Sequence, residues 1–281
     1  MTAEAIQTES AFAELAIDGR VQRLEYAWID PARVDAPLLV FLHEGLGSLA
    51  MWKDFPASLC AAAGARGLVF SRYGYGRSTP RPGAEKWPVG YMHDQALKVL
   101  PALFEQLGVV DPPWLFGHSD GGSIALLYAA AFPERVAGVV AVAPHVFVEG
   151  LSVASIEQAR IAYATTDLRQ RLARYHVDPD SAFFGWNDIW LDPAFRGWNI
   201  EDCLARIRCP VLAVQGEDDP YGTMAQIETI ARRVPQSRLL KLAACGHSPH
   251  RDRPEALVEA VDSFLQACAD FAAAVSRKRN R

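Results

Sequence analysis

This sequence of 281 residues has few cysteines, and no pattern among them suggests a disulfide or a metal site. The five cysteines are scattered and none forms C-x-x-C, so we expect neither a disulfide framework nor zinc, and a cytoplasmic location suits the chain. No uncharged apolar run approaches the roughly 18 residues of a membrane span. The opening segment MTAEAIQTES lacks the basic and apolar regions of a signal peptide. A net charge of −5 offers no positive excess, so we expect no nucleic-acid or membrane partner.

Apolar residues are abundant, at 50% of the chain, which is enough to build a large core. Residues 11–29 alternate apolar and polar side chains around Asp18-Gly19, a pattern typical of a β-hairpin. Apolar runs predict buried strands within 37–44, 66–74, 113–119, 136–146 and 209–217, and a further strand is predicted at 237–245. Helical patterns occupy 51–64, 92–108, the residues after 119, 223–234 and 253–271. This alternation predicts an α/β fold, with a mostly parallel central sheet and helices on both faces.

Residues 148–205 interrupt that alternation. They contain several helical stretches and no convincing buried strand. They also hold an aromatic cluster, which consists of Phe183, Phe184, Trp186, Trp190, Phe195 and Trp198. An insertion that packs as a helical cap over the strand ends explains both features. We therefore predict a core made of residues 1–147 and 206–281, with a cap made of residues 148–205.

The segment Gly117-His118-Ser119-Asp120-Gly121 lies between a predicted strand and a predicted helix. It matches G-x-S-x-G, a turn in which glycines allow a sharp bend that exposes the serine hydroxyl. In an open α/β sheet, ligands bind beyond the carboxyl ends of the strands, where this serine would lie. The following helix begins here, and its backbone N–H groups suit an oxyanion. We therefore predict that Ser119 is a nucleophile.

A serine nucleophile needs a base, and the base needs a carboxylate that holds its tautomer. His247 directly follows Gly246 at the end of the last apolar strand, so we predict it as the base in preference to His250. Three acidic residues follow the preceding strand and compete for the role of the acid: Glu217, Asp218 and Asp219.

These segments resemble the α/β-hydrolase superfamily over nearly the whole chain. GHSDGG, GEDDPYG, CGHSPHRDRPE, FLHEGLGS and SRYGYGRS carry the likeness. In the family pattern the acid stands three residues after the glycine of its turn, which implies Asp219, with Asp218 second. The loop LHEGLGS looks like the family's H-G-x-x-G oxyanion loop, which implies the backbone N–H groups of Gly45 and Asp120 as donors. Glu44 replaces the usual glycine of that loop, and we expect its carboxylate to point away and bond elsewhere.

The resemblance implies a serine hydrolase whose catalytic triad is Ser119, Asp219 and His247, with no metal and no organic cofactor. A small carboxylic ester with an apolar or aromatic group is the leading substrate. The alternatives are a lactone, or a C–C bond beside a ketone as in meta-cleavage product hydrolases. A ligand-sensing receptor on the same fold is the alternative from another class. We expect the pocket to include Glu44, Leu46, Trp186 and Trp190.

Two further segments bear on specificity. Enzymes that resemble valacyclovir hydrolase also have S-D-G-G at the nucleophile, where the aspartate would receive a substrate ammonium group. We expect instead that Asp120 complements the dipole of the helix that it begins. The segment SRYGYGRS, residues 71–78, looks like the family's D-x-R-G-x-G-x-S loop, with Ser71 and Tyr73 replacing the aspartate and the arginine. We expect it to be a structural turn that braces a strand end.

Overall fold

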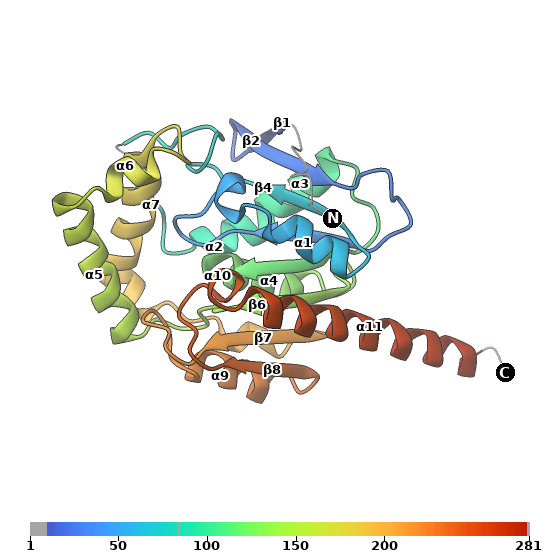
Figure 1. Ribbon diagram of the computed structural model, residues 1–281. Helices are drawn as coiled ribbons and strands as arrows, with labels where there is room; N and C mark the ends of the chain where they lie inside the picture. The colour runs from blue at the N-terminus through green and yellow to red at the C-terminus, as the bar shows by residue number, and fades with distance from the viewer. Residues whose placement is uncertain (1–9, 84, 280–281) are drawn as a thin grey trace.

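The structure, a computed structural model, describes residues 10–83 and 85–279. The amino-terminal segment used above to argue against a signal peptide lies outside this range, except for its last residue. Within the described residues, eight strands form one sheet in the order β1-β2-β4-β3-β5-β6-β7-β8 (Figure 1). The strands are β1 Ala11–Ile17, β2 Arg20–Ile29, β3 Leu38–Leu42, β4 Arg66–Phe70, β5 Trp114–His118, β6 Gly138–Val142, β7 Val211–Gly216 and β8 Ser237–Leu242.

The sheet is antiparallel at one edge and parallel elsewhere, which confirms the predicted fold class. Strands β1 and β2 form the hairpin expected around Asp18-Gly19, and both turn residues have positive φ, as a two-residue hairpin turn requires. Strand β2 pairs antiparallel with β4, and every pair from β4 to β8 is parallel. The carboxyl ends of the parallel strands therefore meet at one edge of the sheet, where a site can form.

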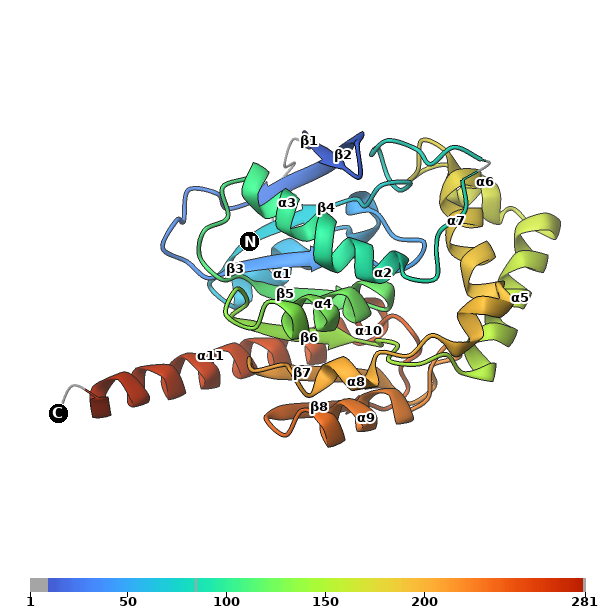
Figure 2. The ribbon, with the colours of Figure 1, turned by 180° about the vertical axis from the view of Figure 1, so that it is seen from behind.

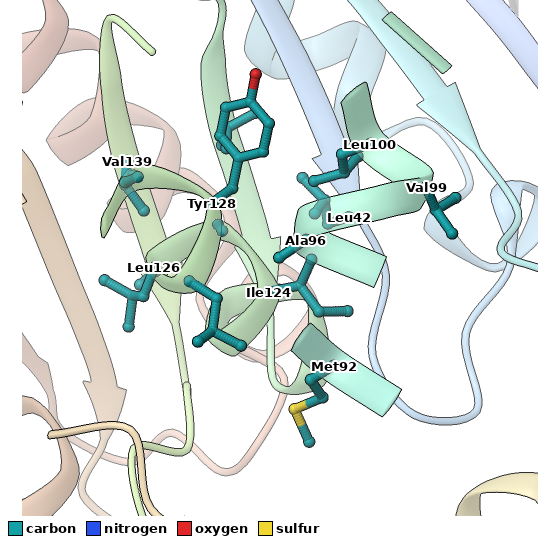
Figure 3. Close-up of a cluster of buried hydrophobic side chains, with 14 of the residues drawn as sticks. Leu42, Met92, Ala96, Val99, Leu100, Ile124, Leu126, Tyr128 and Val139 are labelled. Carbon is teal, nitrogen blue, oxygen red and sulfur yellow. The ribbon is translucent and has the colours of Figure 1, made fainter. Parts of the chain in front are cut away.

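Alternate side chains of the parallel strands build two hydrophobic cores, one on each face of the sheet. Val40 and Leu115 belong to the core that α3, α4 and α9 cover, whereas Phe41 and Phe116 belong to the core that α1 and α11 cover. Figure 3 shows the first core, in which Ile124 of α4 lies among strand and helix side chains. Figure 2 shows α3, α4 and α8 on that face of the sheet. Because both faces are covered, the central strands are apolar throughout.

The helices lie close to the predicted segments. Their bounds are η1 Leu49–Trp52, α1 Phe55–Ala62, α2 Tyr91–Asp94, η2 Gln95–Val99, α3 Leu100–Gln106, α4 Asp120–Ala131, α5 Gly150–Thr165, α6 Leu168–Leu172, α7 Pro179–Leu191, η3 Pro193–Gly197, α8 Glu201–Leu204, α9 Ala225–Arg233, α10 Pro249–Asp252 and α11 Pro254–Arg279. The predicted helix 92–108 is interrupted by η2, a π-helical turn that ends two residues before Pro101. Proline has no N–H for the carbonyl four residues earlier, so the regular hydrogen-bond pattern fails there.

The residues between β6 and β7 form most of one end of the molecule. Helices α5, α6 and α7 contact one another and stand apart from the sheet, while α11 extends in the opposite direction (Figures 1 and 2). Helix α8 contacts α4 and α9 instead. The division of the chain at residues 148 and 205 into core and cap stays a prediction.

Candidate active site

Ser119 occupies the turn between β5 and α4. Its φ of 53° and ψ of −118° lie in a region that residues with a side chain rarely adopt. The glycines around it are required by close packing. A Cβ on Gly117 would lie 2.2 Å from the carbonyl oxygen of Gly121, and a Cβ on Gly121 would lie 2.0 Å from that of Leu42. Strand and helix therefore approach each other closely at this point, and the serine lies at the carboxyl edge of the sheet.

Three side chains that the sequence predicted as a unit are in hydrogen-bond contact. The Nε2 atom of His247 lies 3.0 Å from the Oγ of Ser119. On the other side of the ring, Nδ1 lies 2.9 and 2.8 Å from the two carboxylate oxygens of Asp219. The carboxylate also accepts from the backbone N–H of Tyr221 at 2.8 Å and from the side-chain amide of Gln215 at 2.6 Å. These contacts fix the orientation of the acid.

The electrostatics of this unit favour an ionised acid and one histidine tautomer. Burial alone would raise the pKa of Asp219, but the hydrogen bond and charge of His247, with the N–H of Tyr221, hold it below its ordinary value. An ionised carboxylate accepts hydrogen bonds only, so Nδ1 of His247 carries the proton and Nε2 is free to accept from Ser119.

The competing candidates for these roles lie elsewhere. Glu217 and Asp218 are exposed, whereas only 7% of Asp219 is exposed. His250 is buried, and its ring centroid lies 4.9 Å from that of Trp52. Within the described residues, no group of three or more histidine, cysteine or acidic side chains could hold a metal ion.

A small cavity of about 110 Å³ opens beside Ser119. Its lining residues are Glu44, Gly45, Leu46, Ser119, His145, Ile156, Trp186, Trp190, Tyr221 and His247. All four residues expected in the pocket are therefore at the cavity. Ile156, His145 and Tyr221 also line the cavity and were not predicted there, although Tyr221 lies two residues after Asp219 in the motif GEDDPYG.

The two residues predicted as oxyanion donors both lie close to the nucleophile. Gly45 lies in the loop after β3, and Asp120 begins α4 directly after Ser119. A Cβ on Gly45 would lie 2.1 Å from the Cδ1 atom of Trp186, so the indole packs directly on the glycine backbone. Any larger residue at position 45 would displace this ring.

The carboxylate of Asp120 is completely buried and contacts protein groups. It accepts from the hydroxyl of Tyr91 at 2.7 Å and from the indole N–H of Trp190 at 3.3 Å. The Nη2 atom of Arg72 lies 3.7 Å away. Burial raises the pKa of Asp120, although Arg72 and the two hydrogen bonds oppose the shift. The sequence predicts the helix dipole as the partner of this carboxylate, whereas the structure also surrounds it with Arg72, Tyr91 and Trp190.

The carboxylate of Glu44 is directed toward His118. Its Oε2 lies 3.5 Å from the Nδ1 of His118, whose Nε2 donates to the backbone carbonyl of His247 at 2.6 Å. Burial would raise the pKa of Glu44, but the contact with His118 and the nearby His250 hold it well below its ordinary value. His145, also at the cavity, has its pKa lowered to about 3 by burial and therefore stays neutral.

Comparison with known proteins agrees with the fold. A family model described as "Alpha/beta hydrolase family" matches residues 39–260. An sn-1-specific diacylglycerol lipase of Mus musculus is 24% identical over 82% of this chain and 81% of its own length. The serine hydrolase BPHL of Homo sapiens is 26% identical over 69% of this chain and 67% of its own length. A structure from a study of Nitrososphaera gargenis carboxylesterases aligns with a TM-score of 0.73 at 19% identity, covering 92% of this chain and 99% of that one.

No helix in the described part of the chain combines the length and the apolar character needed to cross a membrane.

Proposed function

Because this chain belongs to the alpha/beta hydrolase family, we propose that it is a serine hydrolase of small carboxylic esters. One observation carries the proposal: hydrogen bonds run from Asp219 through His247 to the hydroxyl of Ser119, at the wall of a cavity. Relatives named as a lipase and a serine hydrolase support hydrolysis at a carbonyl carbon.

The proposed reaction proceeds through an acyl-enzyme. Ser119 attacks the ester carbonyl while His247 accepts its proton, and Asp219 stabilises the imidazolium that forms. The backbone N–H groups of Gly45 and Asp120 stabilise the oxyanion. His247 then returns the proton to the leaving alcohol. Water then attacks the acyl carbon and loses a proton to His247; the bond to Ser119 breaks, His247 returns the proton to Ser119 and the acid leaves, so the cycle needs no cofactor.

The cavity favours a short and neutral acyl group. Its volume of about 110 Å³ is smaller than the roughly 150 Å³ of an apolar cavity that accepts benzene. Its walls are mainly aromatic and aliphatic, and the lining residues include Glu44 but no lysine or arginine. An acidic acyl group would find no lysine or arginine to compensate its charge there. We therefore propose unbranched neutral esters with acyl chains of a few carbons as the preferred substrates.

The test compares the wild type with Ser119→Ala on a series of p-nitrophenyl esters, and Ser58→Ala, an exposed serine on α1, is the matched control. We expect turnover in the wild type and the control and none above background in Ser119→Ala. A fluorophosphonate probe should likewise label only proteins that retain Ser119. Full labelling of Ser119→Ala would contradict the proposal. A lactone and a meta-cleavage product in the same screen test the other bond types, and tight binding without turnover would favour the receptor.

A further inference from the structure

A buried arginine lies behind the candidate active site. Arg72, in the segment that follows β4, is only 2% exposed. Its Nη2 donates to the backbone carbonyl of Glu44 at 2.8 Å and lies 3.7 Å from the carboxylate of Asp120. A guanidinium is costly to bury unless an opposite charge and hydrogen-bond acceptors compensate it. Arg72 therefore joins the loop after β3 to the first residue of α4.

The carbonyl of Glu44 receives a second donor from His43. The backbone N–H of Arg72 donates to Nε2 of His43 at 3.0 Å, so in the neutral ring the proton is on Nδ1. That Nδ1–H donates to the Glu44 carbonyl at 2.7 Å. Burial, together with the charge of Arg72, keeps the pKa of His43 well below its ordinary value, which preserves this neutral form. The backbone N–H of Gly47 donates to the same carbonyl at 3.1 Å, so three donors hold this oxygen, and Arg72 is the charged one.

This carbonyl controls the direction of an oxyanion donor. The C=O of Glu44 and the N–H of Gly45 belong to one planar trans peptide and point in opposite directions. Because the carbonyl faces Arg72 and His43, the N–H is turned to the other side of the peptide. Gly45 lines the cavity beside Ser119. Rotation of this peptide by half a turn would present the carbonyl oxygen to a developing oxyanion and oppose catalysis.

The same guanidinium faces the residue that supplies the other donor. Asp120 contributes its N–H to the proposed oxyanion site, and its carboxylate is held by Tyr91, Trp190 and the charge of Arg72. We propose that Arg72 is a positioning residue that orients the Glu44–Gly45 peptide and anchors Asp120, so that one cation aligns both oxyanion donors. This inference rests on the proposed serine hydrolase function.

The test is Arg72→Leu, with Arg77→Ala as the control from the same segment, where 61% of the side chain is exposed. Loss of one oxyanion donor lowers kcat by about 10²- to 10³-fold, and we expect that loss on a short p-nitrophenyl ester. KM should change by less than about threefold, because the ground-state ester does not depend on the aligned N–H. Arg77→Ala should match the wild type.

An inhibitor distinguishes alignment from a general structural role. An alkyl trifluoromethyl ketone forms a tetrahedral adduct with Ser119 whose oxyanion occupies the same donors. Its inhibition constant should therefore weaken in Arg72→Leu by about the same factor as kcat. Arg72→Lys keeps the charge beside Asp120 and one donor for Glu44, so it should recover most of the loss.

The outcomes separate this inference from the proposed function. If Ser119→Ala abolishes turnover while a folded Arg72→Leu keeps kcat and inhibitor binding within about threefold of the wild type, the role of Arg72 is refuted alone. If Ser119→Ala keeps full turnover, both proposals are refuted. Should Arg72→Leu fail to fold, the double variant Arg72→Leu/Asp120→Asn removes both charges of the buried pair and keeps both backbone donors, and the same criteria apply to it.

Discussion

Replacing Asp219 by asparagine tests the proposed acid directly. The two carboxylate oxygens accept from Nδ1 of His247, the N–H of Tyr221 and the side-chain amide of Gln215. Asparagine has one acceptor oxygen and one donor NH₂ in the same shape. At least one of the three donors would then face the NH₂ group instead of an acceptor.

The size of the loss in kcat depends on which of the three donors faces the NH₂ group. The N–H of Tyr221 is part of the backbone and cannot lose its proton, whereas His247 can move its proton from Nδ1 to Nε2. We expect the NH₂ group to face His247, which leaves Nε2 protonated and unable to accept from Ser119. A triad aspartate changed to asparagine lowers kcat about 10⁴-fold, or about 5.5 kcal/mol of transition-state stabilisation. Asp218→Asn alters an exposed side chain and should keep kcat within about twofold.

The assay is steady-state turnover of p-nitrophenyl acetate at pH 7, with near-ultraviolet circular dichroism to check the fold of each variant. The reasoning fails if folded Asp219→Asn keeps more than about a tenth of the wild-type kcat. It also fails if Asp218→Asn loses as much activity as Asp219→Asn, because the acid would then not be the residue that contacts His247.

Three further outcomes are expected. Ile156→Ala removes three carbons from the cavity wall. At about 0.8 kcal/mol per buried methylene, each carbon added to the acyl chain should then raise kcat/KM about fourfold in this variant. Leu151→Ala, an exposed position on the same helix, should leave the dependence of kcat/KM on chain length unchanged. His145→Gln should not shift the midpoint of the acidic side of the pH–rate profile, because burial lowers the pKa of His145 to about 3 and the ring is neutral in that pH range. A shifted midpoint would show that His145 titrates during the reaction. The pKa of Asp219 lies below its ordinary value, so its ionisation stabilises the fold above about pH 4, and this stabilisation is lost as the pH falls through the folded pKa. The free energies of unfolding of wild type and Asp219→Asn, measured in urea, should therefore converge as the pH is lowered. A constant difference between them would contradict this linkage.

The sheet could be predicted because most of its strands are covered on both faces. The segments around β3, β5, β6 and β7 are apolar at nearly every position, which few other structures explain. Strand β8 also appears as predicted, but it is an edge strand with several exposed positions, including Leu239. The π-helical turn could not be predicted, because Pro101 signals only a missing N–H. The hydrogen bonds that the carbonyls before Pro101 form instead depend on how this helix packs against its neighbours.

The candidate site could be predicted as far as it is encoded in contiguous segments. The turn around Ser119 requires glycines that leave a visible pattern, and Asp219 and His247 lie within five residues of the ends of β7 and β8. The cavity wall has no such pattern. Ile156 reaches the site from α5, so its proximity to Ser119 depends on how α5–α7 pack beside the strand ends, whereas His145 reaches it from the segment after β6.

The two acidic residues that flank the proposed oxyanion site were the least predictable feature, since a carboxylate beside a developing negative charge opposes catalysis. The sequence alone predicts that Asp120 complements a helix dipole, with a substrate ammonium group as the alternative, and that the carboxylate of Glu44 bonds elsewhere, without identifying its partner. In the structure each has a basic partner that lies far from it in the chain: Arg72 for Asp120 and His118 for Glu44. Each partner also binds backbone at the site, because Arg72 holds the Glu44 carbonyl and His118 holds the His247 carbonyl. The acidic residues therefore anchor the groups that bind this backbone, and in the proposed mechanism the N–H groups of residues 45 and 120 are left to determine the local field at the oxyanion.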